Sequence, residues 1–363
     1  MKKKIILIII LFLGIITLKQ YYPYEQLLTA QNNNQPQKEE SYLQENGQIQ
    51  VYFCPHGPCE QAFLSALNQS QHSLHCALYD IGLTSVQTLL EEKSSQIEVQ
   101  IVTDDEYYKK LPLPFVKKDK FGLMHNKFCI IDQQLITTGS MNPTDNDAHK
   151  NNNNLLIINS SLLAQNYEQE FQELWQGTFK KGNKNINSKI MLNHIKIDNY
   201  FCPDDHCAQH TAEQLSQAEE SIYFMTFSFT NQEIADQLLL KNLHNLTIKG
   251  IMEVRQISPY SVYQQLLTNH VDVIKDQNKN NLHHKVFIID QETVITGSFN
   301  PTGNGDKNND ENILIIHDQN IAKLYLNEFN HLWQNWTNQT LNFSLEEIEP
   351  SEYTELEPAS STE

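Results

Sequence analysis

The clearest pattern in this chain is the stretch from His283 to Asn300, HHKVFIIDQETVITGSFN. Its residues follow the spacing His-x-Lys-x4-Asp-x6-Gly-Ser-x-Asn. The same spacing occurs once earlier, from His125 to Asn142, as HNKFCIIDQQLITTGSMN. Two unrelated strand-and-turn segments would not share all of these residue types in register. The two copies therefore predict an internal duplication.

The duplication extends beyond these two motifs. The segment YFCP occurs at residues 52–55 and again at 200–203. Short apolar runs alternate with helically spaced segments in both halves, which is typical of α/β layers. We expect strands at residues 49–53, 73–79, 99–102, 128–131, 135–138 and 155–158, helices at 61–67, 83–90 and 162–175, and a helix at 321–333 that repeats 163–175. The predicted fold is α/β, with two tandem α-β-α repeats packed about a pseudo-twofold axis and an active site at their interface.

Composition indicates where the repeats begin and end. The 363 residues are 39% hydrophobic and 19% charged, which suits a folded body with a sizeable core. A polar, Gly/Asn-rich segment separates the halves, so we place the repeats at residues 48–178 and 190–338. Residues 20–47 are rich in Gln, Asn and Glu and predict a flexible linker. Residues 339–363 carry many glutamates of a chain with formal charge −18, and predict an acidic disordered tail.

The N-terminus has the pattern of an export signal. Three lysines at residues 2–4 precede an apolar run at residues 5–18, and Lys19 follows it. Such a run is typical of a signal peptide and is short for a membrane-spanning helix. We therefore expect residues 1–19 to be a signal peptide or an N-terminal membrane anchor. In either case the body would be exported and extracellular, secreted or anchored by this segment.

Six cysteines bear on the compartment. Cys54 and Cys59 lie in FCPHGPC, and Cys202 and Cys207 lie in FCPDDHC. In an exported chain, two matched pairs favour two local disulfides. The alternative is one zinc site shared by all four cysteines, because the spacing also suits metal ligands. Residues 76 and 129, also cysteines, fall inside apolar runs and are expected to be inert core residues.

Each motif predicts a cluster of side chains that suits a phosphate. Residues two apart on a strand point to the same face, so His125 projects with Lys127, and His283 with Lys285. A hairpin then returns the Gly-Ser turn toward the same end. An imidazole, an ammonium group, a hydroxyl and an amide would stabilise an anion without a metal or other cofactor, because no carboxylate-rich cage accompanies them. The predicted phosphate-binding residues are Ser140, Asn142, Ser298 and Asn300.

Two halves about a pseudo-twofold axis would bring both clusters to one phosphate. One imidazole can then attack as a nucleophile while the other gives a proton to the leaving oxygen. The lysines would hold the non-bridging oxygens. Asp132 and Asp290 are expected to fix the tautomer of an imidazole and stabilise its charged form. We therefore predict His125, Lys127, Asp132, His283, Lys285 and Asp290 as catalytic residues.

Two HxKxxxxDxxxxxxGSxN motifs resemble those of the phospholipase D superfamily, and the resemblance covers most of the body. The YFCP…C opening of each half is similar to the branch of secreted nucleases and mitochondrial cardiolipin hydrolases, whose members usually carry one motif and dimerise. The resemblance implies a two-step, metal-independent transfer through a phosphohistidine, with His125 as the favoured nucleophile. It also implies an acid at Glu311, which we group with the phosphate-binding residues. The matching residue of the first half is Asn153, a departure from the family pattern.

The substrate is expected to be a phosphodiester. A phospholipid head group is favoured, because the predicted N-terminal attachment to a membrane would hold an exported enzyme near lipid. The alternative is an exported endonuclease that cleaves DNA or RNA with the same site. Overall acidity opposes a broad nucleic-acid track, but basic residues upstream of His125 predict a local basic edge: Lys109, Lys110, Lys117, Lys118 and Lys120. A third alternative is a non-catalytic phosphate-binding surface protein. We expect a monomer that contains its own pseudo-dimer.

Overall fold

The computed structural model describes residues 41–120 and 122–346, with side chains up to residue 335. These residues belong to one compact unit that begins at Tyr42. The first half contains β2 (Gln48–Cys54), α2 (Cys59–Asn68), β3 (Ser73–Leu78), α3 (Thr84–Ser94), β4 (Glu98–Thr103), η1 (Tyr108–Lys110), β5 (Val116–Lys118), β6 (Leu123–Met124), β7 (Lys127–Ile131), β8 (Leu135–Gly139), α4 (Asp145–His149), β9 (Asn153–Asn159) and α5 (Ser161–Trp175).

The second half repeats this order. It contains β10 (Lys189–Leu192), β11 (Ile195–Cys202), α6 (Cys207–Ser216), β12 (Ser221–Thr226), α7 (Gln232–Leu243), β13 (Thr247–Met252), η2 (Val254–Gln256), α8 (Tyr263–Thr268), β14 (Asp272–Lys275), β15 (Lys285–Ile289), β16 (Thr293–Gly297), α9 (Gly303–Lys307), β17 (Asn309–His317) and α10 (Gln319–Glu346). The predicted strands and helices are all present.

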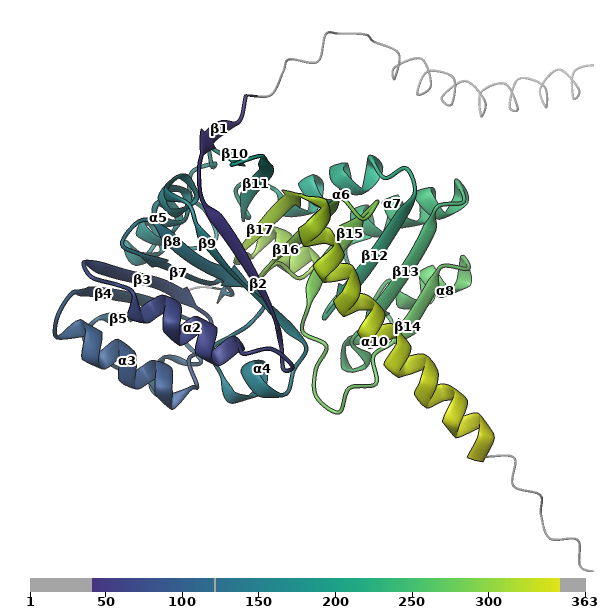
Figure 1. The fold of residues 1–363 in the computed structure, drawn as a ribbon, viewed down its shortest axis with the longest axis horizontal. Coiled ribbons are helices and arrows are strands. Elements are labelled where there is room, and N and C mark those ends of the chain that lie inside the picture. The colour runs from purple at the N-terminus through teal and green to yellow at the C-terminus, as the bar shows by residue number, and fades with distance from the viewer. Residues whose placement is uncertain (1–40, 121, 347–363) are drawn as a thin grey trace, which may run out of the picture. The chain divides into compact units, whose positions relative to one another are not determined.

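The two sheets share one strand order. In the first sheet it is β2-β9-β8-β7-β3-β4-β5, and in the second it is β11-β17-β16-β15-β12-β13-β14, with β10 and β1 added at the β11 edge. In the first sheet, β3 pairs in parallel with β4 and antiparallel with β7, the strand that begins at the motif lysine. In the second sheet, β12 has the same relation to β13 and β15. This correspondence, visible in Figure 1, confirms the duplicated α/β fold.

The hairpin after each motif strand has local causes in the sequence. Asp132 and Gln133 have φ values of 51° and 55°, and Asp290 repeats this at 50°. Aspartate tolerates this left-handed backbone better than most residues. At Gly139, where φ is 131°, an added Cβ would lie 2.5 Å from a backbone oxygen on β9. The glycine is therefore needed for the strand to turn toward the site.

One hydrophobic core is shared by the two halves. Helices α5 and α10 contribute Tyr167 and Tyr325 to it, and both side chains are fully buried. Phe128 of the first sheet packs edge-on against Tyr167, which packs in turn against Phe201 of the second sheet. Separate cores fill the outer sides of the two sheets. The shared core holds the two sheets in a fixed relation, and this relation positions the site.

The folded body extends further in both directions than the predicted linker (residues 20–47) and tail (residues 339–363) allowed. Residues 43–45 form β1 (Leu43–Glu45), which pairs in parallel with β10 of the second half. Glu45 also accepts hydrogen bonds from the first backbone N–H groups of α5. At the other end, α10 continues to Glu346, so the first residues of the predicted tail are helical. The predictions for residues 1–40 and 347–363 concern residues outside those described.

No helix within residues 41–120 and 122–346 is long and apolar enough to cross a membrane. The cysteines of both FCP segments form the predicted local disulfides, Cys54–Cys59 and Cys202–Cys207, in place of a shared zinc site.

The prediction for Cys76 and Cys129 was wrong, because they form a third disulfide. The two residues face each other directly on the antiparallel strands β3 and β7. Periodicity placed both in strands, but it did not show which strands pair, so the bridge could not be predicted.

Candidate active site at the seam between the halves

The histidine and lysine of each motif lie at the start of a buried strand. Lys127 opens β7 and Lys285 opens β15, and each histidine lies two residues earlier. All four side chains are buried, with His125 6% and His283 8% exposed. Each lysine Nζ donates to the carbonyl oxygen of the histidine that precedes it, at 2.6 Å and 2.7 Å. This contact holds each His-Lys pair as a unit.

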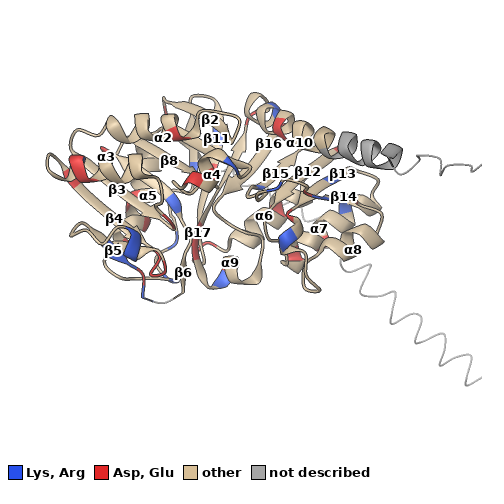
Figure 2. Cartoon of the chain, turned by 90° about the horizontal axis from the view of Figure 1, so that it is seen from below, with Lys and Arg blue, Asp and Glu red and all other residues tan. Residues whose placement is uncertain are grey.

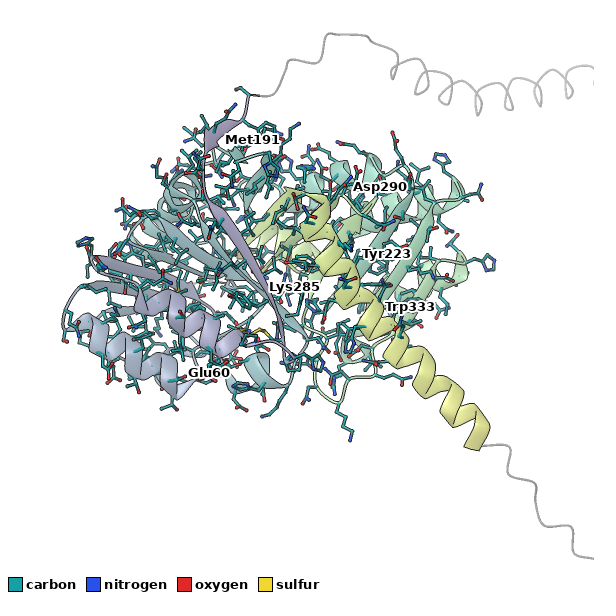
Figure 3. The ribbon with its side chains drawn as sticks, in the orientation of Figure 1. Glu60, Met191, Tyr223, Lys285, Asp290 and Trp333 are labelled. Carbon is teal, nitrogen blue, oxygen red and sulfur yellow. A yellow bond between two sulfur atoms is a disulfide. The ribbon has the colours of Figure 1, made fainter. Side chains whose placement is uncertain are left out.

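Reciprocal backbone hydrogen bonds join the two motifs. The His125 N–H donates to the Asp310 carbonyl oxygen at 3.0 Å. The His283 N–H donates to the Asn152 carbonyl oxygen at 2.8 Å. Each histidine backbone is therefore bound by the half to which it does not belong. Figure 3 labels Lys285 in this region, which we call the seam.

The imidazole of His125 contacts one acid and one aromatic ring. Its Nδ1 lies 2.8 Å from the Oε2 of Glu311, a fully buried residue of the opposite half. The Tyr79 ring packs edge-on, with ring centroids 5.0 Å apart. We expected Glu311 beside the substrate phosphate, and the structure places its side chain against the imidazole of His125.

The imidazole of His283 has a different set of partners. Its Nδ1 lies 2.9 Å from the Oδ1 of Asn153, which occupies the position equivalent to Glu311. The Oδ2 of Asp147 on α4 lies 3.5 Å from the same nitrogen. The Phe227 ring packs edge-on at 4.9 Å, as Tyr79 does in the other half. The residue that departs from the family pattern, Asn153, therefore contacts His283 of the other half and not His125 of its own half.

The buried histidines, lysines and glutamate of the seam all have shifted pKa values. Burial lowers the pKa of His125 and His283 well below the usual value, and the lysines of both motifs lower them further. Burial also lowers the pKa of Lys127 to about 8 and that of Lys285 well below its usual range. It raises the pKa of Glu311 to about 8, although the lysines oppose this. An anion between the lysines would relieve their repulsion.

The motif serines have partners within the protein. The Ser140 hydroxyl donates to Asn153 Oδ1 at 3.0 Å, and the Ser298 hydroxyl hydrogen-bonds the Glu311 side chain. In each half the next backbone N–H on the strand donates to the same hydroxyl at 3.0 Å. The serines therefore hold the side chains that contact the histidines, and phosphate binding by the serines stays a prediction.

The motif asparagines lie at the edge of the cluster. The Asn142 Nδ2 donates to Asp147 Oδ2 at 2.6 Å, so this amide already has an acceptor. The Oδ1 atoms of Asn142 and Asn300 are buried without a partner among the residues described. Phosphate binding by these two amides stays a prediction.

The motif aspartates are placed away from the histidines, contrary to expectation. Asp132 accepts hydrogen bonds from the backbone N–H groups of residues 71–73, at 2.7–2.9 Å. Asp290 accepts three equivalent bonds from residues 219–221. Each lies five residues beyond the motif lysine, and a strand of that length carries it about 17 Å away. Figure 3 shows Asp290 and Lys285 at opposite ends of β15. These aspartates fix the hairpin to the start of the neighbouring strand.

A buried hydrogen-bond network fixes the two halves to each other. The Nδ2 of Asn154 donates to Thr296 Oγ1 at 2.5 Å and to Tyr325 Oη at 2.6 Å, both in the opposite half. The equivalent Asn312 Oδ1 accepts from Thr138 and Tyr167 at 3.0 Å and 3.2 Å. A shift of one half would leave these buried groups unsatisfied.

Sequence reasoning missed three residues that contact the histidines. Tyr79 and Phe227 follow matching strands of the two halves, so an aromatic residue at the same place in both repeats was a usable signal. Asp147 has no counterpart in the second half, and its contact depends on the fold alone. His75, which has no counterpart in the second half, pairs with Glu168 away from the site.

Two imidazoles and two lysines lie together at the interface of a duplicated α/β fold, and such groups are chemically suited to phosphoryl transfer. A family model described as "Cardiolipin synthase, PLD-like domain" matches residues 63–175 and 211–333. The chain belongs to this phospholipase D-like family. It is an enzyme of the phosphodiester-hydrolase class.

Individual relatives agree with this assignment. Phospholipase D of Rickettsia conorii is 34% identical over 149 residues, which cover 41% of this chain and 71% of that protein. Mitochondrial cardiolipin hydrolase of Xenopus laevis is 34% identical over 131 residues, 36% of this chain and 62% of the relative. Phosphatidylserine synthase of Haemophilus influenzae has a similar fold, with a TM-score of 0.58 and 12% identity over 77% of this chain and 84% of its own.

Proposed function

We propose that this chain hydrolyses a phosphodiester through a covalent phosphohistidine on His125, with His283 as the general acid and base. The observation that carries the proposal is the contact of Glu311 with Nδ1 of His125. A carboxylate at Nδ1 directs Nε2 toward the substrate and stabilises the positive charge that develops when the ring is phosphorylated. His283 has the amide of Asn153 at the equivalent position, and we assign the proton transfers to it.

The reaction would proceed in two displacements. The Nε2 of His125 attacks phosphorus, the bond to the leaving oxygen breaks, and the Nε2–H of His283 gives that oxygen its proton. Water then attacks the phosphorus and loses a proton to His283, and the P–N bond breaks to restore His125. Lys127 and Lys285 stabilise the charge on the non-bridging oxygens in both steps, which is the role that a metal has in other phosphoryl-transfer sites.

A phospholipid head group is the substrate class that we favour. The curated relatives carry the names phospholipase D and mitochondrial cardiolipin hydrolase, and their sequence similarity to this chain supports the same substrate class. The predicted export signal would also place the enzyme where lipid is accessible.

A nucleic acid is the second candidate, because a basic and aromatic edge lies beside the site. Lys109 and Lys118 are exposed, and Lys118 lies near the Tyr108 ring. Tyr107 contacts Tyr79, which contacts His125. Alternating cations and aromatic rings suit a single strand that leads into the seam. Figure 2 shows the basic residues on β5.

The test compares the wild type with His125→Ala and His283→Ala on a panel of substrates: a phospholipid, single-stranded DNA and RNA, and duplex DNA. Both variants should lose hydrolysis, and EDTA should leave the wild-type rate unchanged. Because Asp104, Asp105 and Asp119 lie close enough together to share a cation, the melting temperature is recorded with and without EDTA. Activity in either alanine variant would contradict the proposal, and cleavage of nucleic acid alone would remove the lipid assignment.

We also propose that the chain acts outside the cytoplasm as a monomer, with repeats at residues 48–178 and 190–338. Three disulfides suit an oxidising compartment, and one chain supplies both motifs. Sedimentation of the folded body at one chain mass would support this, and an obligate dimer would contradict it.

A further inference from the structure

The two repeats carry an acid for the site at different positions. When their Gly-Ser turns are aligned, Glu311 of the second repeat corresponds to Asn153 of the first. Asp147 of the first repeat corresponds to Gly305 of the second. The second repeat thus has its acid on β17 and a glycine on α9. The first has an amide on β9 and its acid on α4. The exchange leaves one carboxylate beside each histidine.

Asn153 fixes the orientation of His283 but supplies no charge. Its Nδ2 donates to the Asp147 carbonyl oxygen at 3.1 Å, so its Oδ1 is the atom that faces the imidazole. An amide oxygen only accepts hydrogen bonds, and therefore holds His283 in the form that carries hydrogen on Nδ1. The proton for a leaving oxygen must then be carried on Nε2.

Asp147 supplies the missing negative charge. It is 4% exposed, and its Oδ2 lies 3.5 Å from His283 Nδ1. The Asn142 N–H donates to the same oxygen at 2.9 Å, and Asn151 donates to the other. Burial raises the pKa of Asp147, but His283 and these hydrogen bonds outweigh it and hold the pKa below its usual value. The group is therefore a carboxylate when the enzyme works.

We propose that Asp147 is a positioning residue that stabilises the protonated form of His283, so that Asn153 and Asp147 together do for His283 what Glu311 does alone for His125. The inference rests on the proposed function for the role of His283 as general acid. It assigns to α4, a short helix outside both motifs, a direct part in setting the proton affinity of the site.

The charges around His283 make this contribution necessary. Lys285, Lys127 and His125 all disfavour a proton on His283, and burial does so more strongly. Asp147 opposes them from α4. Without it, the pKa of His283 would fall further, and a smaller fraction of the enzyme could protonate a poor leaving group.

The competing interpretation is that Asp147 only holds the turn, through Asn142 and Asn151. The test therefore uses Asp147→Asn, which keeps the shape, and Asp147→Asn with Asn153→Glu, which returns the acid to the position used in the second repeat. Asp145→Asn is the matched control, because Asp145 is an exposed acid on the same helix and pairs with Lys150. Rates are measured with two substrates. Diphenyl phosphate has a poor leaving group, phenolate, and bis(p-nitrophenyl) phosphate has a good one, p-nitrophenolate.

Asp147→Asn should lower kcat for diphenyl phosphate about 100-fold and for bis(p-nitrophenyl) phosphate by less than about threefold, because only the first substrate needs the proton. Adding Asn153→Glu should restore at least about a tenth of the rate lost. Histidine NMR should show a lower pKa for His283 in Asp147→Asn and no change in Asp145→Asn.

Equal loss on both substrates, loss that Asn153→Glu does not restore, or an unchanged His283 pKa would overturn the inference and leave a structural role. The NMR titration needs no turnover. The two proposals can therefore fail separately. If the His283 pKa falls in Asp147→Asn while the separate variant His125→Ala stays active, the contact of Asp147 with His283 is supported and the proposed function is contradicted.

Discussion

The Nδ1 atom of His125 lies 2.8 Å from the Oε2 atom of Glu311, although 186 residues separate the two in the chain. His283 has the reciprocal relation with Asn153 of the first half. Each histidine is therefore carried by one repeat and oriented by the other. Neither repeat holds a complete site, which explains why a buried network of asparagine, threonine and tyrosine side chains fixes their relation.

Glu311→Gln should lower kcat by about 10²–10⁴-fold, because a glutamine orients His125 but cannot stabilise its positive charge. Steady-state kinetics on bis(p-nitrophenyl) phosphate measures this. Glu328→Gln is the matched control, since Glu328 lies 3.4 Å from the buried His284 outside the site. A similar loss in both variants would show that the effect of Glu311 is one of folding.

With bis(p-nitrophenyl) phosphate, whose leaving group needs no proton from His283, kcat/KM should have a maximum near pH 8. Below it, the pair of His125 and Glu311 holds an additional proton, since the pKa of Glu311 is about 8. Whether that proton makes an imidazolium or a neutral acid that donates to Nδ1, the Nε2 of His125 carries a hydrogen and cannot attack. Above it, Lys127 loses its charge, because its pKa is also about 8. Glu311→Gln should move the acid limb to lower pH, and an unmoved limb would exclude Glu311 as its source.

Asp132→Ala should destabilise the protein by about 1–3 kcal/mol, because three backbone N–H groups lose a charged acceptor. The kcat of the folded fraction should stay within about twofold of wild type, since the group is remote from the histidines. Burial opposes ionisation of Asp132, but these hydrogen bonds hold its pKa below the usual value. Its contribution is thus present above the unfolded pKa and is lost as pH falls through the folded pKa. Urea unfolding at several pH values, with rates from the same samples, checks both parts. A large fall in kcat would restore a catalytic role.

Sequence alone predicted the duplicated α/β fold, because strand and helix periodicity and the repeated motif agree along the whole body. It also predicted that the lysine of each motif lies beside its histidine, since side chains two apart on a strand must share a face. It misplaced Asp132 because a motif gives spacing along the chain and not the direction in which the strand leaves the site. It missed Asp147 because no repeat or period indicates that α4 of one half reaches the histidine of the other.

Removing the Cys76–Cys129 disulfide should cost more stability than removing Cys54–Cys59. The first closes a loop with a sequence separation of 53 residues and the second one of 5. Loop-closure entropy predicts losses of about 4 and about 2 kcal/mol. Urea unfolding of the two double serine variants measures the difference. Equal losses would show that the effect of these bridges is not mainly on the unfolded chain.

The central claim is that one site forms at the seam, with His125 as nucleophile. The most direct measurement is the mass of His283→Ala after mixing with bis(p-nitrophenyl) phosphate. The leaving group of this substrate needs no proton, so the first step can proceed. The second step lacks its general base in this variant, so the intermediate should accumulate. We expect a burst of about one p-nitrophenolate per chain and one phosphoryl adduct on His125, with none in His125→Ala. An adduct on His283 in His125→Ala, or continued turnover of His283→Ala without an adduct, would contradict it.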